Sequence, residues 1–274
     1  MVLNNKTIVL TGAAGGIGRC MAFALAKAGA RLILVGRNTD SLEALRVQLP
    51  KAHGTHLCVP TQLQDANARA DLVGICVAND VDILINNAGV SEFRLLADSD
   101  ANAIESLIAL NLTVPMQLSQ ALVEHLQTRP EAAIINIGSA FGSIAYPGFS
   151  VYSASKFGLR GFSEALQREL SDTSVRVMHL APRATTTEIN SANIVAMNRQ
   201  LGNAMDAPEL VAEKLLHSIK NNCWKSLVIG WPEMLYAKIN GVFPSLTTGA
   251  ITKQLEQIKQ FARAEAKSLL ASKS

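Results

Sequence analysis

Short apolar, β-branched runs alternate with segments of helical spacing along most of this chain. The runs cover residues 7–11, 31–35, 56–60, 82–86, 133–138, 175–180 and 226–230, and helical spacing marks 17–28, 41–49, 66–77, 104–126 and 152–170. Because the runs are apolar throughout, helices must cover both of their faces. The pattern predicts an α/β fold, a three-layer doubly wound Rossmann fold with a parallel sheet of about seven strands.

The length and composition favour one domain over residues 1–274. The chain has 274 residues, of which 49% are hydrophobic, and neither a repeat nor a Pro/Gly-rich linker divides it. A net charge of +3 and 5% aromatic residues, without a long basic run, argue against a nucleic-acid partner. The five histidines form no metal-ligand pattern, so no metal is expected.

Cysteine usage and the N-terminus bear on the compartment. Cys20, Cys58, Cys76 and Cys223 are widely spaced without a C-x-x-C pair, which favours a reducing cytoplasm. The N-terminal MVLNNK leads directly into a strand, and no apolar run approaches the ~20 residues that span a bilayer. We expect a cytoplasmic protein that is soluble or peripheral to a membrane.

The first expected strand runs directly into a glycine-rich turn and a helix. The turn reads Thr11-Gly12-Ala13-Ala14-Gly15-Gly16-Ile17-Gly18. A lone glycine cluster is usually only a tight turn, but here strand, turn, helix and second strand fall within ~30 residues, where backbone N–H groups can bind a pyrophosphate. The expected dinucleotide contacts are Gly12, Ala14, Gly15, Gly16, Ile17 and Gly18.

The end of the second expected strand bears on the choice of cofactor. It reads Leu34-Val35-Gly36-Arg37-Asn38, where an NAD-preferring protein usually presents a carboxylate to the ribose 2′-hydroxyl. The planar guanidinium of Arg37 can instead pair with a 2′-phosphate. The sequence therefore favours NADP(H) over NAD(H), with Arg37 and Asn38 beside the ribose. The alternative is that Arg37 is a solvated loop residue.

Tyr152, Lys156 and Ser139 are the candidate catalytic residues. Tyr152 and Lys156 are four positions apart in an expected helix, which places their Cβ atoms about 5–6 Å apart on one face, and Ser139 ends the fifth expected strand. A phenol with a pKa near ~10 is a poor proton shuttle at neutral pH, but a nearby ammonium lowers that pKa by about 1–3. We interpret Tyr152 as the acid/base and Ser139 as the hydrogen-bond donor to the substrate oxygen. The Y-x-x-x-K spacing alone is common on exposed helices.

These motifs, with Asn86-Asn87-Ala88-Gly89 after the fourth strand, resemble the short-chain dehydrogenase/reductase superfamily. By this resemblance, Asn87, Ala88 and Gly89 lie beside the adenosine side of the cofactor and brace the sheet. Gln62 and Leu63 stand where many members carry an aspartate that meets the adenine. Lys156 would hold the nicotinamide ribose.

The resemblance also assigns roles to Asn111 and to the segment after the sixth strand. Asn111 would be the fourth catalytic residue, which kinks the long helix and fixes a water beside the lysine, whereas composition alone makes it an ordinary helix asparagine. Pro182, Arg183, Thr185 and Thr187 would lie beside the nicotinamide carboxamide. Arg183 replaces the usual glycine, so its cation either approaches the nicotinamide and a substrate carboxylate or phosphate, or points away into a structural salt bridge.

Two further segments bear on the substrate. Residues 187–206 correspond to the substrate lid of the family, and their apolar positions suggest an apolar substrate, although core packing explains them almost as well. Residues 231–274 form a helical extension in which Ile251, Leu255, Ile258 and Ala262 have helical spacing beside several basic residues. This stripe either lies on a membrane surface or packs on the domain or a subunit interface.

The sequence favours an oxidoreductase that transfers a hydride between NADP(H) and an apolar ketone or secondary alcohol. One alternative is a reductase of 3-oxoacyl thioesters, although the tail lacks the closing glycine-rich segment of those relatives. Another is a non-catalytic NADP(H)-binding sensor, which would have no need for the set Asn111, Ser139, Tyr152 and Lys156. The resemblance implies a homodimer or homotetramer in which the helices following Ile104 and Tyr152 pair across a two-fold axis.

Overall fold

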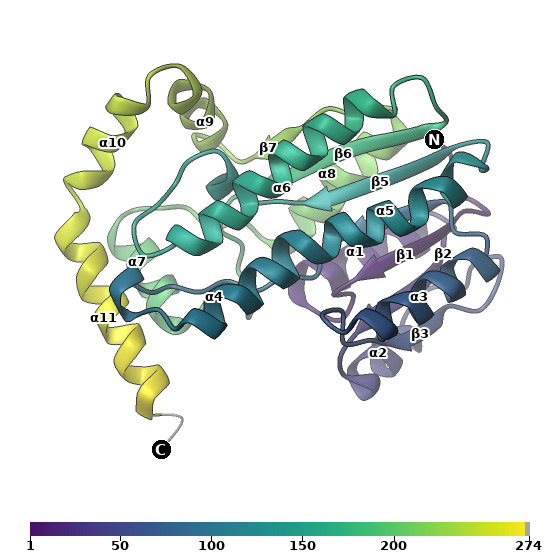
Figure 1. Ribbon diagram of the computed structural model, residues 1–274, viewed down its shortest axis with the longest axis horizontal. Coiled ribbons are helices and arrows are strands. Elements are labelled where there is room, and N and C mark those ends of the chain that lie inside the picture. Colours follow the sequence, from purple (N-terminus) through teal and green to yellow (C-terminus); the bar gives the residue numbers. More distant parts are fainter. Residues whose placement is uncertain (272–274) are drawn as a thin grey trace.

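The computed structural model describes residues 1–271 and contains a seven-stranded parallel sheet in the order β3-β2-β1-β4-β5-β6-β7 (Figure 1). The strands are β1 (Thr7–Thr11), β2 (Arg31–Gly36), β3 (Leu57–Pro60), β4 (Ile83–Asn86), β5 (Ala132–Ile137), β6 (Val175–Pro182) and β7 (Leu227–Ile229). Every expected strand is present, and the predicted doubly wound fold class is confirmed.

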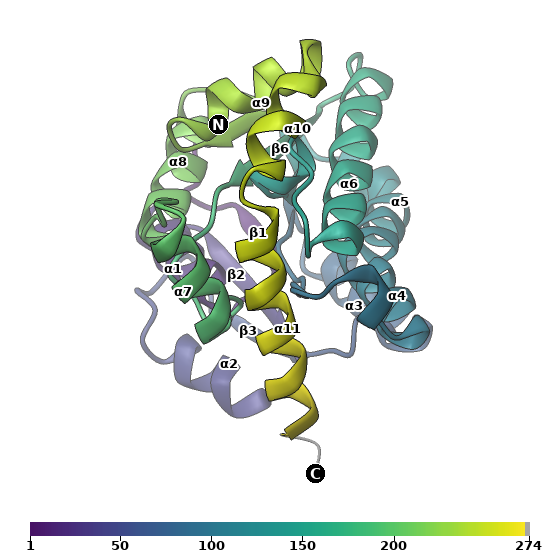
Figure 2. The same ribbon diagram turned by 90° about the vertical axis from the view of Figure 1, so that its left-hand side faces the viewer.

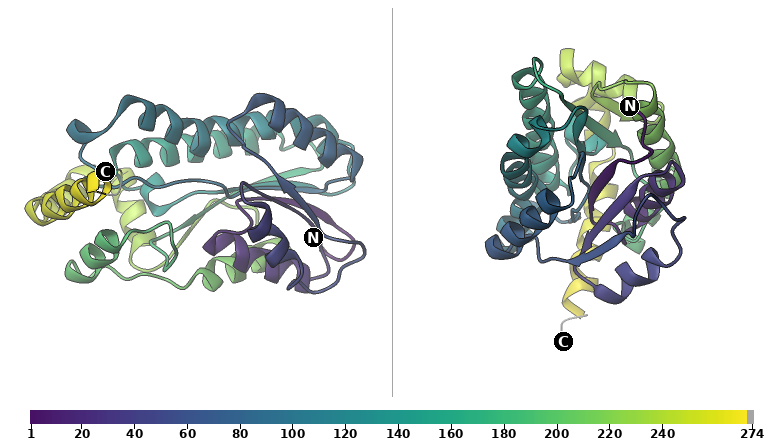
Figure 3. Two further views of the ribbon diagram at one scale, coloured as in Figure 1. Left: turned by 90° about the horizontal axis from the view of Figure 1, so that it is seen from below. Right: turned by 90° about the vertical axis from the view of Figure 1, so that its right-hand side faces the viewer.

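Helices cover both faces of the sheet, as the apolar strands require (Figures 1 and 3). One layer contains α1 (Gly16–Lys27), α2 (Thr39–Arg46) and α8 (Pro208–Lys220), and the other contains α3 (Ala66–Ala78), α4 (Ala101–Ile108), α5 (Val114–Gln127) and α6 (Ser150–Glu169). Successive strand residues enter opposite layers: Ile8 and Leu10 pack with α1, whereas Val9 packs with α5. The carboxyl ends of the strands therefore remain available for a site.

The expected helix over 104–126 is longer and is interrupted. It consists of α4, a π-helical turn (Ala109–Thr113) and α5. Taken as one stretch, Ala101–Gln127 is long and apolar enough to cross a membrane by length and composition, which the sequence analysis did not anticipate. Its apolarity has a local explanation, since Val114, Leu118 and Leu122 are buried against the sheet.

The C-terminal extension stands across the carboxyl ends of the strands (Figures 1 and 2). It comprises α9 (Glu233–Val242), α10 (Pro244–Thr252) and α11 (Leu255–Ala271). Helix α11 packs against α7 (Ala192–Gln200), and Ile258 and Ala262 are fully buried there. Of the alternatives left open for this stripe, packing on the domain is the one present at Ile258 and Ala262.

Candidate active site

A cavity of about 1100 Å³ lies at the carboxyl ends of the strands and extends from the glycine turn to α10. Its lining contains every expected site residue except Asn111: Gly12, Ala14, Gly15, Gly16, Ile17, Gly18, Arg37, Asn38, Gln62, Leu63, Asn87, Ala88, Gly89, Ser139, Tyr152, Lys156, Pro182, Arg183, Thr185 and Thr187. One continuous space thus connects the two halves of the site that the sequence indicated separately.

The glycine turn leaves backbone donors open to this cavity. Gly12 has φ +64°, and a Cβ there would lie 2.9 Å from the Ala88 Cα. A Cβ on Gly18 would lie 2.1 Å from the Gly12 carbonyl oxygen, so the turn and α1 pack closely only without side chains. Gly15 precedes α1 without a side-chain cap, and the first turn has no acidic residue. The free N–H groups and the helix dipole suit a pyrophosphate.

Thr11 and Asn87 hold this turn against β4. The Thr11 hydroxyl accepts hydrogen bonds from the Asn87 and Ala88 N–H groups at 2.9 and 3.0 Å. The Asn87 side-chain amide donates to the Thr11 and Gly12 carbonyls at 2.9 and 3.1 Å. The brace expected of Asn87 is therefore present, and Thr11, whose role the sequence analysis missed, is its partner.

Arg37 is exposed at the end of β2 and faces the cavity. No salt bridge within residues 1–271 involves its guanidinium. The neighbouring Asn38 caps α2 by accepting a hydrogen bond from the Ser41 N–H at 2.8 Å, and Ser41 also lines the cavity. Arg37 is therefore available to an anionic group of a ligand.

Gln62 and Leu63 follow β3 at the far end of the same cavity. Leu63 is buried, whereas Gln62 is exposed and donates a weak hydrogen bond to Gln64 at 3.4 Å. The Gln62 amide is therefore available to a ligand, while Leu63 contributes only an apolar surface.

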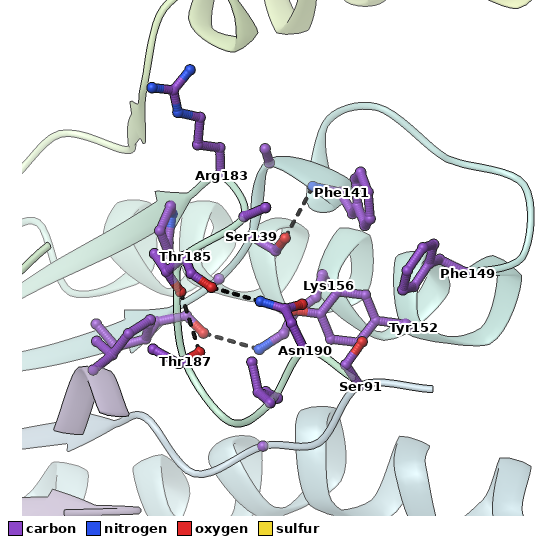
Figure 4. A pocket seen from close by; sticks show the side chains of 18 of the residues that line it. Ser91, Ser139, Phe141, Phe149, Tyr152, Lys156, Arg183, Thr185, Thr187 and Asn190 are labelled. Carbon is purple, nitrogen blue, oxygen red and sulfur yellow. Dashed lines mark hydrogen bonds between the residues drawn. The ribbon is translucent and has the colours of Figure 1, made fainter. Parts of the chain in front are cut away.

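The first two turns of α6 carry Tyr152 and Lys156. The Lys156 Nζ lies 5.7 Å from the centre of the Tyr152 ring and donates a hydrogen bond to the Ile137 carbonyl at 3.1 Å. Ser139 follows β5, and its hydroxyl accepts a hydrogen bond from the Phe141 N–H at 3.1 Å. These three side chains lie near one another in the lining of the cavity (Figure 4).

Burial dominates the acid–base properties of this pair. It raises the pKa of Tyr152, and a hydrogen bond from Ser139 offsets part of the rise. Burial also lowers the pKa of Lys156 to about 8. In the protein chain itself, burial therefore raises the Tyr152 pKa, which is opposite in direction to the lowering expected from the lysine.

Asn111 lies outside the cavity lining, in the π-helical turn, and is fully buried. Its side-chain carbonyl accepts a hydrogen bond from the Val90 N–H at 2.9 Å, and its amide donates to the Val90 carbonyl at 2.8 Å. A weaker bond reaches the Ser155 hydroxyl at 3.3 Å. Asn111 thus connects the loop after β4 to α6, and the interrupted helix agrees with the expected kink.

Arg183 points away from Tyr152 and Lys156 (Figure 4). Its guanidinium contacts Asp206 at 2.5 Å and Glu233 at 3.1 Å, and it donates to the Trp231 carbonyl at 2.8 Å. Of the two alternatives left open by the sequence, the structural salt bridge is the one present. It connects the end of segment 187–206 to the start of the extension.

Thr185 precedes segment 187–206 and Thr187 begins it, with the Thr187 side chain over the glycine turn. Their hydroxyls are 3.5 Å apart, and the Asn190 amide donates to the Thr185 carbonyl at 2.7 Å (Figure 4). A Cβ on Gly16 would lie 2.5 Å from the Thr187 methyl. Both threonines line the cavity, and Thr187 does so beside the start of α1, where a dinucleotide would need hydrogen-bond partners.

Residues 6–197 match the short chain dehydrogenase family. The chain belongs to this family. Ketoacyl reductase HetN of Nostoc sp. is 30% identical over 229 residues, covering 82% of this chain and 79% of the relative. The NADP-dependent 3-hydroxy acid dehydrogenase of Schizosaccharomyces pombe is 29% identical and covers 79% and 88%.

A solved structure supports the same assignment. The crystal structure of a metagenomic short-chain oxidoreductase in complex with NADP has a TM-score of 0.69 and 28% identity, covering 84% of this chain and 98% of the other. The family match ends at residue 197, so the extension lies outside it. The part of this short chain dehydrogenase that differs from the family pattern is therefore the C-terminal part, which borders the substrate half of the cavity.

An aromatic wall, which the sequence analysis missed, borders the substrate half. Phe93, Phe141, Tyr146 and Phe149 stack or tilt against one another at centroid distances of 4.8–6.5 Å, and Tyr152 contacts two of them edge-on. The hydroxyl of Tyr146 is buried without a hydrogen-bond partner among the described residues. The signal was the concentration of aromatic residues between positions 141 and 152 in a chain with only 5% of them.

His179 lies on β6 beside the reacting end. Its Nε2 occupies the space beside Gly138, where a Cβ would lie 2.1 Å away. Burial, together with the charges of Lys156 and Arg160, lowers the pKa of His179 to about 4. The imidazole is therefore neutral at physiological pH and adds no charge beside Lys156.

Proposed function

We propose that this protein is an NADP(H)-dependent oxidoreductase that interconverts a large apolar ketone and its secondary alcohol. One observation carries the proposal: a single cavity joins the uncapped start of α1 to the Ser139, Tyr152 and Lys156 side chains. A dinucleotide-binding half and a proton-transfer half in one space suit hydride transfer to a carbonyl. A sensor would not need the second half.

The residues of the cavity fit a dinucleotide. The glycine turn and Thr187 would hold the pyrophosphate, Gln62 and Leu63 the adenine, and Lys156, Pro182 and Thr185 the nicotinamide end. The exposed Arg37 and the lack of a carboxylate at the end of β2 favour a 2′-phosphate, in line with an NADP-dependent relative. When bound, the cofactor supplies a hydride in reduction or accepts one in oxidation.

Tyr152 would exchange the proton at the substrate oxygen. Its raised pKa keeps the phenol protonated at neutral pH, which suits donation to a carbonyl oxygen in the reducing direction. Ser139 would donate a second hydrogen bond to that oxygen as charge develops on it. A Lys156 pKa of about 8 leaves the ammonium mostly charged at pH 7, so it stabilises the phenolate that remains.

The substrate end of the cavity is largely apolar. Its lining includes Phe141, Phe149, Ile194, Met197 and Ile251. We propose that segment 187–206 acts as the lid, since α7 forms part of this wall and the extension closes the other side. A 3-oxoacyl thioester is the second candidate substrate, supported by the similarity to a relative named as a ketoacyl reductase.

We propose that the protein is cytoplasmic and that each subunit is a single catalytic domain. We also propose that the subunits form a homodimer or homotetramer, with α4, α5 and α6 at the subunit contacts. One exposed aromatic side chain on α6, Phe157, lies on this surface.

The experiment that tests the function follows the near-ultraviolet absorbance of NADPH with a panel of apolar ketones and 3-oxoacyl thioesters. Tyr152→Phe should lower kcat by about 10²–10⁴-fold, because the general acid is lost, while NADPH affinity stays within a factor of about 3 (roughly 0.7 kcal/mol). Tyr236→Phe removes a hydroxyl from the same cavity and is the matched control. Equal turnover by Tyr152→Phe and the parent would refute the mechanism.

A further inference from the structure

The helices α9 and α10, which lie in the upper part of Figure 2, carry a concentration of exposed apolar side chains. The α9–α10 patch consists of Trp231, Met234, Leu235, Tyr236, Val242, Phe243 and Leu246. Seven of the fifteen exposed large hydrophobic residues of the described chain lie in this 16-residue segment. Exposed apolar residues scattered singly are ordinary, but a contiguous group marks an interaction surface.

The patch is held in place by polar contacts beneath it. Arg183 pairs with Glu233 at the start of α9, and the Asn240 side chain donates a hydrogen bond to the Ser143 carbonyl at 2.9 Å. Thr247 on α10 donates to the Asn240 side chain. The apolar side chains therefore project outward from a fixed pair of helices.

The exposed charged side chains of the segment that carries the patch are basic. Within residues 231–254 the charged side chains are Glu233, Lys238 and Lys253. Glu233 is paired with Arg183, which it shares with Asp206, whereas Lys238 and Lys253 are exposed and make no salt bridge within the described part of the chain. Apolar and aromatic side chains bordered by lysines match the acyl and headgroup regions of an anionic lipid surface.

A lipid surface fits this charge distribution better than a second copy of the chain. A two-fold pairing brings two copies of the same basic patch together, which gathers like charges at the interface. Negative headgroups instead complement them. The cavity also reaches this surface, because Tyr236 and Leu246 belong both to the patch and to the cavity lining.

We propose that the α9–α10 patch docks on an anionic membrane surface and that the cavity receives its apolar substrate through this end. The delivery of substrate rests on the proposed function, whereas the docking does not. The docking surface thus differs from the α11 stripe, which is buried against α7.

The test is cosedimentation of the full chain with vesicles of phosphatidylcholine alone or mixed with phosphatidylserine. Leu235→Ser/Val242→Ser/Phe243→Ser should lower binding to the mixed vesicles by about tenfold or more, the change expected from losing one buried large apolar side chain. None of these three positions lines the cavity. Val47→Ser/Val77→Ser/Leu96→Ser removes three exposed apolar residues elsewhere and should bind like the parent.

Two further measurements test whether the patch contacts the anionic lipid directly. Lys238→Glu should weaken binding to the mixed vesicles more than to neutral ones. In a Trp224→Phe background, Trp231 is the remaining tryptophan, and its emission should shift to shorter wavelength on the mixed vesicles. Equal binding by the triple variant and the parent would overturn the proposal. So would a parent dimer that the triple variant converts to a monomer, because the patch would then be a self-interface.

The docking and the proposed function can fail separately. Vesicle binding is measured without cofactor or turnover, and the triple variant should reduce a small water-soluble ketone at the parent rate. Loss of that activity would place the three residues in the catalytic machinery, against the proposal. Unchanged turnover in Tyr152→Phe would refute the mechanism and leave the docking result intact.

Discussion

His179 is a buried residue on β6 that makes the stability of the folded chain depend on pH. Its folded-state pKa is about 4, below the ordinary value of 6.5, because burial disfavours the imidazolium. The unfolded chain therefore binds an additional proton between these two values. The stabilisation is complete above pH 6.5 and is lost as the pH falls toward 4, with a slope of at most about 1.4 kcal/mol per pH unit.

We predict that His179→Asn removes this slope. Urea denaturation at several pH values should show the parent losing its stability advantage over the variant as the pH falls from 6.5 to 4. His217→Asn, at an exposed position on α8, should keep the pH dependence of the parent. Parallel stability curves for the parent and His179→Asn would show that the imidazole is not the titrating group.

The residues of the site could be predicted from the sequence where their relations are local. Tyr152 and Lys156 are four positions apart on one helix, and the glycine turn lies within a single strand–helix unit. Arg183 is different, because its carboxylate partners are 23 and 50 positions away. The rise of the Tyr152 pKa could not be predicted from the sequence either, since it depends on burial by residues from several elements.

At the scale of elements, the strands were predictable because a strand buried on both faces is apolar along its whole length, and this run is visible in the sequence. The packing of the extension was not. The stripe containing Ile258 and Ala262 shows that α11 buries one face, but an amphipathic pattern is the same whether the partner is α7 or lipid. The π-helical turn around Asn111 is likewise set by the Val90 backbone on another segment.

Because α7 and α11 pack mainly on each other, we predict that they can unfold locally while the sheet stays folded. Ile258→Ala should remove buried contacts with Ile194 and Met197, and Ile→Ala substitutions of this kind cost about 2–5 kcal/mol. The Asn193 amide and the Glu265 carboxylate, 2.6 Å apart, remain as the polar contact of the pair. Hydrogen exchange should therefore become faster in α7 and α11 while β4 and β5 keep the parent rates.

Lys259→Ala, on the same helix but away from the buried stripe, is the control and should leave the exchange of α7 unchanged. If exchange in β5 rises together with that of α7, the extension and the sheet unfold as one cooperative unit. In that case segment 187–206 could not open independently of the sheet, and its role as a lid would be refuted.

At the scale of the whole molecule, cofactor binding is coupled to global stability. A ligand that binds only the folded chain adds about 2.7 kcal/mol at 100 times its Kd. For a chain of this size, each kcal/mol corresponds to roughly 2 °C in Tm. NADPH at that concentration should therefore raise Tm by about 5 °C, and NADH at the same concentration should raise it less, because only the 2′-phosphate can pair with Arg37.

Arg37→Asp should reverse this order, since a carboxylate at the end of β2 repels the 2′-phosphate and accepts a hydrogen bond from a 2′-hydroxyl. Lys51→Asp makes the same charge change at an exposed position outside the cavity and should keep the preference of the parent. Thermal unfolding with each cofactor measures both effects without a substrate, so the outcome does not depend on knowing which carbonyl is reduced. Equal Tm shifts by NADPH and NADH in the parent would exclude Arg37 as the discriminating residue and would leave the glycine turn as the common anchor of both cofactors.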